Sequence, residues 1–379
     1  MMPRILIVGA GATGAACANI LRQRLLQNVE LVMWDKSKGT GGRMSTSRSP
    51  DNNLCVADLG AQYVTVIPKY AEKHARYYKD LTTCGLLEPL TSKIDGMKSD
   101  SYEPGTKHYV APKGISSLVK HFIKQSGIDV EFNHFLSKLD TVEDKSLSDV
   151  KLYASGHKEG SPDATWDSVK PFDAVILTMP LPQLMKLPGT TQEYLAQHPD
   201  TKQQLESACY SSRYALGLFF SPGSDIDVPW DATYVTGDPC IRWLAVDNRK
   251  RGVKESSELG ASMVVHTSVP FGIKYLETDK NEVQGIVMEH LRNLVPNLPE
   301  PASIKCQKWR YSQVSTPVEG TPGCVFLTKL PSCAILATGD AFTHSNFDGC
   351  LSAAETTCEQ LLAYLKETGQ VGMESSSGL

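Results

Sequence analysis

The start of the chain consists of two apolar runs separated by a segment of mixed apolar and polar residues. The run from Arg4 to Val8 is rich in Ile and Val, which predicts a short strand buried on both faces. From Ala15 to Gln27, small and long aliphatic residues mix with Arg and Gln, a pattern that favours a helix. A second apolar run, Glu30 to Trp34, predicts another strand, which ends on Asp35. The N-terminal region is therefore predicted to be a strand–helix–strand unit.

The rest of the pattern predicts two kinds of region. Helices are expected at 70–85, 112–125 and 349–367, and strands at 130–139, 172–178 and 334–340. The charged stretch 143–166 is expected to form a hairpin with a loose tip. Between 181 and 301 the chain is more aromatic, and 213–220 and 261–269 alternate as strands of an antiparallel sheet do. We therefore expect an α/β fold with a second region built on an antiparallel sheet.

Size and charge narrow the class of protein. The chain has 379 residues and a net charge of −4, with 41% hydrophobic and 21% charged residues. This length fits two domains, and the composition is that of a folded soluble protein. The balanced charge argues against a nucleic-acid partner. No apolar run is long enough for a membrane-spanning helix, so no membrane partner is expected.

Ten cysteines are scattered without a C-x-x-C pair or zinc-ligand spacing, so we expect no metal site. They indicate reduced thiols in a cytoplasmic protein, and the alternative is a secreted, partly disulfide-bonded chain. The uncharged run Ile5 to Leu21 after Arg4 has the look of a signal peptide. However, cleavage there would remove the first strand and the glycine-rich turn that follows it. We therefore interpret this run as part of the fold.

The glycine-rich turn predicts a dinucleotide site. Gly9 would allow a tight turn, Gly11 a close approach of the backbone to a pyrophosphate, and Gly14 close packing of helix and strand. The helix that begins here would direct N–H groups and a partial positive charge at the phosphates. Asp35 follows at the distance typical of a carboxylate that binds ribose hydroxyls. The alternative is a glycine-rich turn that binds nothing.

Two later segments carry further candidate binding residues. Gly42 and Arg43 lie in a glycine-rich stretch, where the Arg side chain could pair with a phosphate; the alternative is a surface loop with a stray Arg. The small-residue turn 57–63 is expected to return toward the same site. The last strand ends in Gly339–Asp340, and Gly349 precedes the final helix.

With these motifs together, the chain resembles the flavoproteins of the amine-oxidase and hydroxylase superfamily over its whole length. The resemblance implies FAD rather than NAD as the bound dinucleotide, because an NAD enzyme needs only the first motif. It implies that Asp340 holds a ribityl hydroxyl and that the helix after Gly349 stabilises negative charge on the flavin. The implied architecture is a Rossmann-like FAD-binding domain (1–70, 106–180 and 303–379) interleaved with a smaller α+β substrate domain (71–105 and 181–302).

Longer strings are similar to one vertebrate oxidase of that superfamily: Trp34–Lys36, Gly41–Met44, Asp58–Tyr63, Ser211–Phe219, Cys306–Arg310 and Ser345–Cys350. This similarity implies a monomer that oxidises the 2-dihydro and 6-dihydro isomers of NAD(P)H. Hydride would pass to flavin N5, and O2 would be reduced to hydrogen peroxide. In such proteins the positions of Thr13, Arg43, Gln62 and Tyr63 contact FAD. Related proteins are also described as secreted and as amine oxidases.

Hydride transfer between flat rings needs stacking and orientation more than acid–base groups. Candidate catalytic residues facing the flavin are Tyr214, His266 and Trp309, with Trp243 a further candidate. For Tyr214, Trp243 and His266 the alternative is an ordinary role in the core. Basic residues could meet a substrate phosphate, although solvated surface positions are the commoner case; they are Arg242, Lys308 and Arg310.

Two other classes of function remain as alternatives. A catecholamine-type amine oxidase would need an aromatic cage, but the segment 345–348 has no Tyr before Gly349. No Cys follows soon after Trp309, so the FAD is expected to be noncovalent. The second alternative is a secreted signalling protein without enzymatic activity.

Overall fold

The computed structural model describes residues 2–97, 102–144, 149–158, 160–168, 170–253 and 259–371. The chain divides into two compact units. The first unit comprises Met1–Gly42, Val119–Cys209 and Val314–Leu379, and the second comprises Arg43–Leu118 and Tyr210–Gln313. The chain therefore passes between the units several times, as expected for interleaved domains.

The first unit contains two sheets and several helices. Its strands are β1 (Arg4–Val8), β2 (Glu30–Asp35), β9 (Val130–Phe132), β10 (His134–Asp144), β11 (Asp149–Lys158), β12 (Ser161–Asp167), β13 (Ala174–Leu177), β19 (Cys324–Lys329) and β20 (Ala334–Thr338). Its helices are α1 (Ala12–Leu25), α5 (Leu181–Leu184), α6 (Thr190–Gln197), α7 (Pro199–Glu206) and α11 (Phe347–Glu367), with a 3-10 turn at Asp340–Phe342. Helix α4 (Ser116–Ser126) begins in the second unit and continues into the first.

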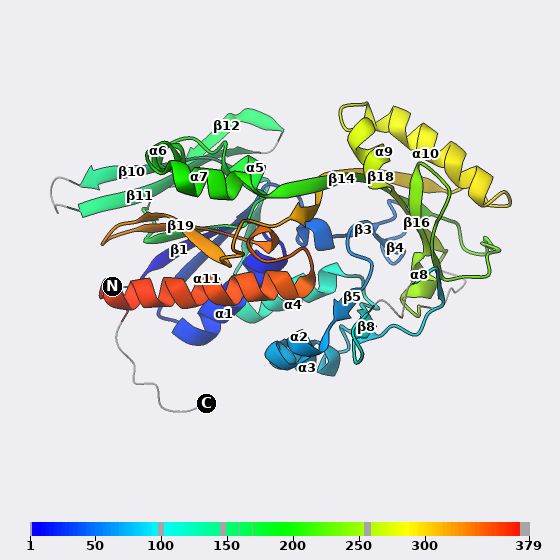
Figure 1. Ribbon diagram of the computed structural model, residues 1–379, viewed down its shortest axis with the longest axis horizontal. Helices are drawn as coiled ribbons and strands as arrows, with labels where there is room; N and C mark the ends of the chain where they lie inside the picture. Colours follow the sequence, from blue (N-terminus) through cyan, green and yellow to red (C-terminus); the bar gives the residue numbers. More distant parts are fainter. Residues whose placement is uncertain are drawn as a thin grey trace. The chain divides into compact units, whose positions relative to one another are not determined.

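The larger sheet of the first unit has the order β19-β20-β13-β1-β2-β9. All neighbours are parallel except β19, which is antiparallel to β20. Strands β1, β13 and β20 are almost wholly apolar and buried, as strands covered on both faces must be. Helices α1 and α11 lie together on one side of this sheet, and β10–β12 lie on the other (Figure 1). The carboxyl ends of the parallel strands lead into the glycine turn and into Asp340, so the fold brings these motifs to one edge.

The second unit is built on a mainly antiparallel six-stranded sheet, with two smaller sheets beside it in the chain's topology. Its strands are β3 (Thr46–Arg48), β4 (Val56–Asp58), β5 (Val64–Val66), β6 (Glu88–Pro89), β7 (Ile94–Asp95), β8 (Lys107–Val110), β14 (Cys209–Phe219), β15 (Ala232–Tyr234), β16 (Ile241–Val246), β17 (Ser262–Thr267) and β18 (Ser303–Thr316). Its helices are α2 (Pro68–Lys73), α3 (Ala75–Thr83), α8 (Asp247–Lys250), α9 (Val269–Lys274) and α10 (Lys280–Leu294), with a 3-10 turn at Gly42–Met44.

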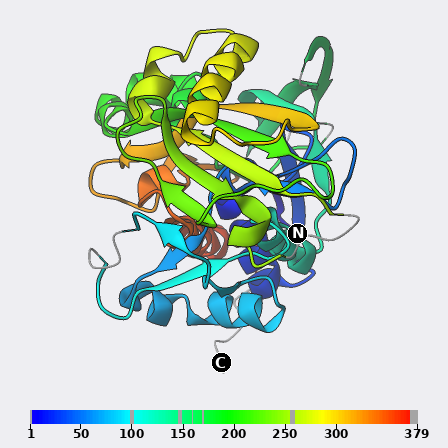
Figure 2. The same cartoon turned by 90° about the vertical axis from the view of Figure 1, so that its right-hand side faces the viewer.

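The six-stranded sheet β18-β14-β17-β16-β15-β7 buries its two faces against different partners. Residues with even numbers in β14, such as Leu216 and Leu218, pack against α9 and α10 in one core cluster. Figure 2 shows these two helices, in yellow, over that face of the sheet. The odd-numbered Ala215 and Phe219 pack instead against Ala57 of β4. The alternation expected for this region therefore separates a helix-covered face from a β4-covered face.

The α/β class and the antiparallel second region are confirmed, while several element boundaries differ from the sequence prediction. The strand predicted at 130–139 is split into β9 and β10, because Asn133 between them adopts a positive φ of 59°. The predicted hairpin is a three-stranded meander, β10-β11-β12. The helix predicted at 70–85 is interrupted at His74, which lies between α2 and α3.

The compact units also differ from the predicted domain boundaries. The segments 43–70, 106–118 and 303–313, predicted for the FAD-binding domain, lie in the second unit, because β4 packs on the antiparallel sheet and β18 is one of its strands. The segment 181–209, predicted for the substrate domain, lies in the first unit, where α6 contacts β10 and β19. Among the described residues, no helix is both long enough and apolar enough to cross a bilayer.

Candidate functional site

The glycine turn of the first unit has the geometry of a phosphate loop. Gly9 has a φ of +111°, and a Cβ on Gly14 would lie only 2.0 Å from the Gly9 carbonyl oxygen. Gly11 is the N-cap of α1 and makes no side-chain cap, so the first N–H groups of the helix are left to meet a ligand. A Cβ on Gly11 would meet no atom of the chain within 4 Å. This space beside backbone donors fits a pyrophosphate, and Thr13 stands in the first turn of the same helix.

Asp35 holds this loop to the end of β2. Its Oδ2 accepts a hydrogen bond from the backbone N–H of Ala10 at 2.7 Å, and its Oδ1 accepts from the N–H of Ser37 at 2.7 Å. The N–H of Gly41 donates to the Ala10 carbonyl, and Gly42 follows with a φ of +55°. The structure therefore brings Asp35 and both early glycine motifs together in the first unit, and the predicted role of Asp35 as a ribose acceptor stays a prediction.

A second backbone cradle lies at the start of α11. Gly339 adopts a φ of +137°, and Asp340 accepts a hydrogen bond from Ser345 Oγ at 2.9 Å. The side chain of Asn346 caps α11 by accepting from the Gly349 N–H at 2.6 Å. A Cβ on Gly349 would lie 1.9 Å from the carbonyl oxygen of His344, so this position requires glycine. Asp340 and the amino end of α11 are thus set in the same unit as the glycine turn, which fits the groups that FAD presents.

The turn 58–63 of the second unit closes over Arg43. The N–H of Ala61 donates to the Arg43 carbonyl at 2.9 Å, and a Cβ on Gly60 would lie 1.8 Å from the same oxygen. Only glycine therefore allows this close approach. The predicted FAD contacts Arg43, Gln62 and Tyr63 are brought together here, and their contact with FAD stays a prediction.

The side-chain amide of Gln62 is fully engaged. Its Nε2 donates to the backbone carbonyls of Asp58 and Gly60. Its Oε1 accepts from Trp243 Nε1 at 3.0 Å and from Lys250 Nζ at 2.9 Å. With donors and acceptors all matched, the orientation of the amide is fixed.

Beneath this turn lies a buried cluster of charges that the sequence did not reveal. Asp247 and Lys250 are both fully buried, with Oδ1 and Nζ 2.7 Å apart. Arg251 Nε lies 2.9 Å from Asp247 Oδ2. Burial, and next the charge of Asp247, raise the pKa of Asp58 to about 6, against the opposing effect of Lys250 and Arg251. Burial alone would raise the pKa of Asp247, but the two cations outweigh it and lower that pKa.

Three flat side chains converge on the turn from the β4-covered face of the sheet. Trp309 Nε1 donates to the Leu59 carbonyl at 2.9 Å, and His266 Nε2 lies 3.1 Å from the same oxygen. Trp243 reaches Gln62, as described above. Burial, and then the charges of Arg213 and Lys250, lower the pKa of His266 to about 3. His266 is therefore a neutral imidazole at physiological pH.

Tyr214 points away from these residues, into the core formed with α9 and α10. It is fully buried, and its hydroxyl donates to the Tyr275 carbonyl at 2.8 Å. The strand alternation that sends Ala215 toward β4 sends Tyr214 to the opposite face. The placement matches the core alternative, so we leave Tyr214 out of the proposed site.

An aromatic pair borders the same turn. The hydroxyls of Tyr63 and Tyr234 are hydrogen-bonded at 2.5 Å. The ring centroids of Tyr234 and Trp243 lie 4.7 Å apart. Burial, and then the contact with Tyr234, raise the pKa of Tyr63 well above its usual range. Both phenols are therefore neutral at physiological pH.

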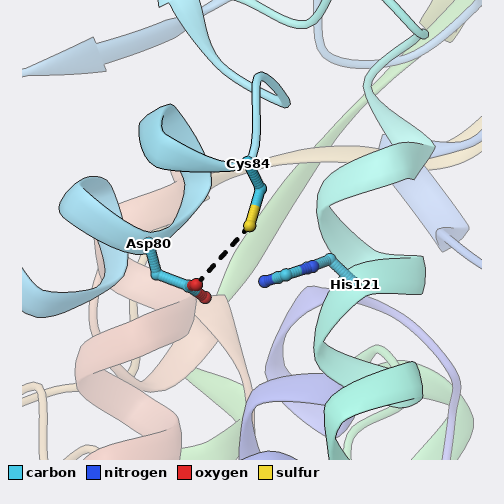
Figure 3. Close-up of side chains that lie close together, drawn as sticks. All are labelled: Asp80, Cys84 and His121. Carbon is cyan, nitrogen blue, oxygen red and sulfur yellow. Dashed lines mark hydrogen bonds between the residues drawn. The ribbon is translucent and has the colours of Figure 1, made fainter.

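Among the described residues of the second unit, potential metal ligands lie close together at two places, Asp80 with Cys84, and Asp238 with Cys240 and His290. Cys84 Sγ lies 3.8 Å from Asp80 Oδ1 on α3 (Figure 3). One carboxylate oxygen of Asp238 accepts hydrogen bonds from the backbone N–H groups of Cys240 and Ile241. The other oxygen lies 2.8 Å from His290 Nδ1. Burial raises the pKa of the neighbouring Cys240 thiol to about 12, so it is protonated. Asp238 and His290 therefore have hydrogen-bond partners within the unit.

Comparison with known proteins agrees with this geometry. Residues 7–81 match the model of an NAD(P)-binding Rossmann-like domain, and residues 85–362 match that of the flavin containing amine oxidoreductases. A solved structure of a candidate protoporphyrinogen oxidase from Exiguobacterium sp. 255-15 has a TM-score of 0.64 at 13% identity and covers 97% of this chain and 99% of its own, which shows the fold alone.

The sequence comparison is closer. The chain is 42% identical to renalase of Mus musculus over 364 residues, which cover 96% of this chain and 100% of that protein. The match to the flavin containing oxidoreductases supports FAD as the cofactor, and the phosphate loop and the α11 cradle fit it. The chain therefore belongs to the renalase family of FAD-dependent oxidoreductases.

Proposed function

We propose that this oxidoreductase converts the 2-dihydro and 6-dihydro isomers of NAD(P)H to NAD(P)⁺. In the proposed reaction a C–H bond of the dihydropyridine breaks, its hydrogen and electron pair pass to N5 of bound FAD, and O2 then takes two electrons and two protons to leave as H2O2. The role of the protein in this reaction is to bind and orient the substrate and to exclude water, because hydride transfer needs no general base.

Three flat, uncharged side chains on one sheet face of the second unit support this substrate class. Trp243 and Trp309 each have the indole N–H tied to the turn 58–63, which fixes the orientation of both rings. His266 between them is uncharged because its pKa is about 3. Such a surface suits a planar substrate ring, which can stack on flat side chains that are held in fixed orientations.

The same observation disfavours an amine substrate. An amine is mostly an ammonium ion at neutral pH and must lose a proton before oxidation, yet His266 and the phenols of Tyr63 and Tyr234 are poor bases for that step. The hydrogen bond between the two phenols also joins the ends of the rings, so these two rings do not leave a slot between them for an amine. The single observation that carries the proposal is that Trp243 and Trp309 are each held to the turn 58–63 by an indole hydrogen bond, beside His266.

Anaerobic stopped-flow absorbance tests the proposal directly. The flavin band of the purified holoprotein is followed after mixing with 2-dihydro and 6-dihydro isomers of NADH, with ordinary NADH, and with dopamine. We expect rapid bleaching with the isomers, slow bleaching with ordinary NADH and none with dopamine. Bleaching by dopamine alone would instead support the amine oxidase, and bleaching by none of them, with FAD bound, would show that the proposed substrate is wrong.

A further inference from the structure

Arg213 is a half-buried cation without a counter-charge. Its Nη1 donates to Gln313 Oε1 at 2.8 Å, to Ser312 Oγ at 3.2 Å and to Ser211 Oγ at 3.3 Å. All three acceptors are neutral. Among the described residues no carboxylate lies within ion-pair distance of this guanidinium, and its Nε and Nη2 have no hydrogen-bond partner. Burial lowers the pKa of Arg213 because the charged form is partly removed from water.

Two other candidate phosphate ligands of this unit are engaged elsewhere. Arg310 forms a two-pronged ion pair with Glu277, and Lys308 Nζ donates to the carbonyls of Leu276 and Thr278. Both side chains therefore turn toward the segment after α9, away from Trp309. Arg242 is exposed and donates to the Val235 carbonyl. Arg213 is thus the half-buried candidate whose remaining donors are available for an anion.

The position of Arg213 places it with the candidate site. It lies two residues before Ala215 on β14, so it emerges on the β4-covered face of the sheet. Ala215 pairs directly with His266 of the neighbouring strand. Gln313, which holds Nη1, belongs to β18, the strand that also carries Trp309. The guanidinium therefore lies on the same sheet face as the neutral rings.

We propose that Arg213 binds a phosphate group of the dinucleotide substrate through its Nε and Nη2 donors; this inference rests on the proposed function. A planar guanidinium can hold two phosphate oxygens at once, and the new ion pair would compensate a cation that burial has partly desolvated. The negative groups of FAD have other candidate partners, because the phosphate loop and the amino end of α11 belong to the first unit. Arg213 would therefore serve the substrate and not the cofactor.

A substrate series separates binding of the phosphate from binding of the ring. Three compounds share the same 6-dihydronicotinamide ring: the dinucleotide, the mononucleotide and the riboside. Only the dinucleotide and the mononucleotide carry phosphate. We compare wild type, R213Q and R213K by anaerobic flavin reduction, recording the limiting rate and the half-saturation concentration. The matched control is R310Q, which removes an Arg bound to Glu277 on the other face.

For R213Q we expect the half-saturation concentration of both phosphate-bearing substrates to rise about 10- to 100-fold, the usual effect of losing hydrogen bonds to a charged group. The limiting rate and all values for the riboside should stay unchanged, R213K should lie between, and R310Q should match wild type. An equal effect on the riboside, or loss of FAD from R213Q on gel filtration, would overturn the inference, because Arg213 would then serve the ring or the cofactor.

A binding measurement keeps this result separate from the proposed function. Pyrophosphate is titrated calorimetrically into oxidised holoprotein, and we expect binding to wild type and R310Q but not to R213Q. Equal binding to wild type and R213Q, or no binding to either, would overturn the inference. If no isomer bleaches wild type while pyrophosphate binding still depends on Arg213, the anion site stands and the proposed function fails. If all isomers bleach wild type and R213Q alike, the function stands and the anion site fails.

Discussion

The candidate binding groups of the two units are of different kinds. In the first unit the candidate binding groups are mainly backbone N–H groups, positioned by glycines that no other residue can replace without a clash, such as Gly14. In the second unit they are side chains locked by one another, as Gln62 is by Trp243 and Lys250. A site made of backbone groups therefore depends on space, whereas a site made of side chains depends on a network of partners that must all be present.

Filling the tight turn in the first unit should have the largest effect. In G14A the new Cβ would lie 2.0 Å from the Gly9 carbonyl, so the turn cannot form without a shift of the backbone. We expect loss of FAD and a large loss of soluble protein. The matched control is G11A, whose Cβ meets nothing in the chain; the apoprotein should unfold at the wild-type temperature while FAD affinity falls. Measured by thermal unfolding and FAD titration, equal behaviour of the two variants would contradict the distinction between them.

Breaking the buried ion pair in the second unit comes next. K250M leaves Asp247 with Arg251 as its remaining ion-pair partner, and losing one partner of a buried pair destabilises proteins by about 3–5 kcal/mol. The urea midpoint should fall, and it should fall further in D247N, which leaves the buried cations Lys250 and Arg251 without their common partner. A K250M protein as stable as wild type would show that the network does not hold the turn.

Much of the first unit was predictable from sequence, and much of the second was not. The glycine turn and the start of α11 are read from short spacings, because each depends on backbone geometry within a few residues. Asp35, which contacts Ala10, is read from its position at the end of the second predicted strand. Lys250 contacts Gln62 although 188 positions separate the two residues in the sequence. The charged residues around Lys250 have the pattern of a solvated surface segment. Strand alternation could have placed Tyr214 and Arg213 on opposite faces, but it could not say which face would be covered by α9 and α10 and which by β4.

The two faces of the antiparallel sheet should respond differently to conservative changes. W309F removes the hydrogen bond to Leu59 that orients the ring, and we expect slower flavin reduction by the dihydro isomers with little change in stability. Y214F removes a buried hydrogen bond to Tyr275 and should lower stability by about 1 kcal/mol with the rate of flavin reduction unchanged. Stopped-flow traces and urea titrations of the two variants would contradict the assignment of the faces if the effects were exchanged.

A pH series tests the buried charges beneath the turn 58–63. The pKa of Asp58 is about 6 in the folded protein and near 3.8 in the unfolded chain. A raised folded pKa gives stability that is complete below the unfolded value and is lost as pH rises through the folded value. The melting temperature of wild type relative to D58N should therefore fall between about pH 4 and pH 6 and level off above it. A constant difference across this window would show that Asp58 does not titrate there.

The most direct test of the proposed chemistry is a single anaerobic turnover with a 6-dihydro isomer of NADH carrying deuterium on the reacting carbon. We expect the flavin band to bleach, to bleach more slowly than with the protium compound, and to yield one NAD⁺ for each FAD. No bleaching with either compound, in a holoprotein whose flavin is reduced by dopamine, would contradict the proposal that this chain takes hydride from a dihydronicotinamide.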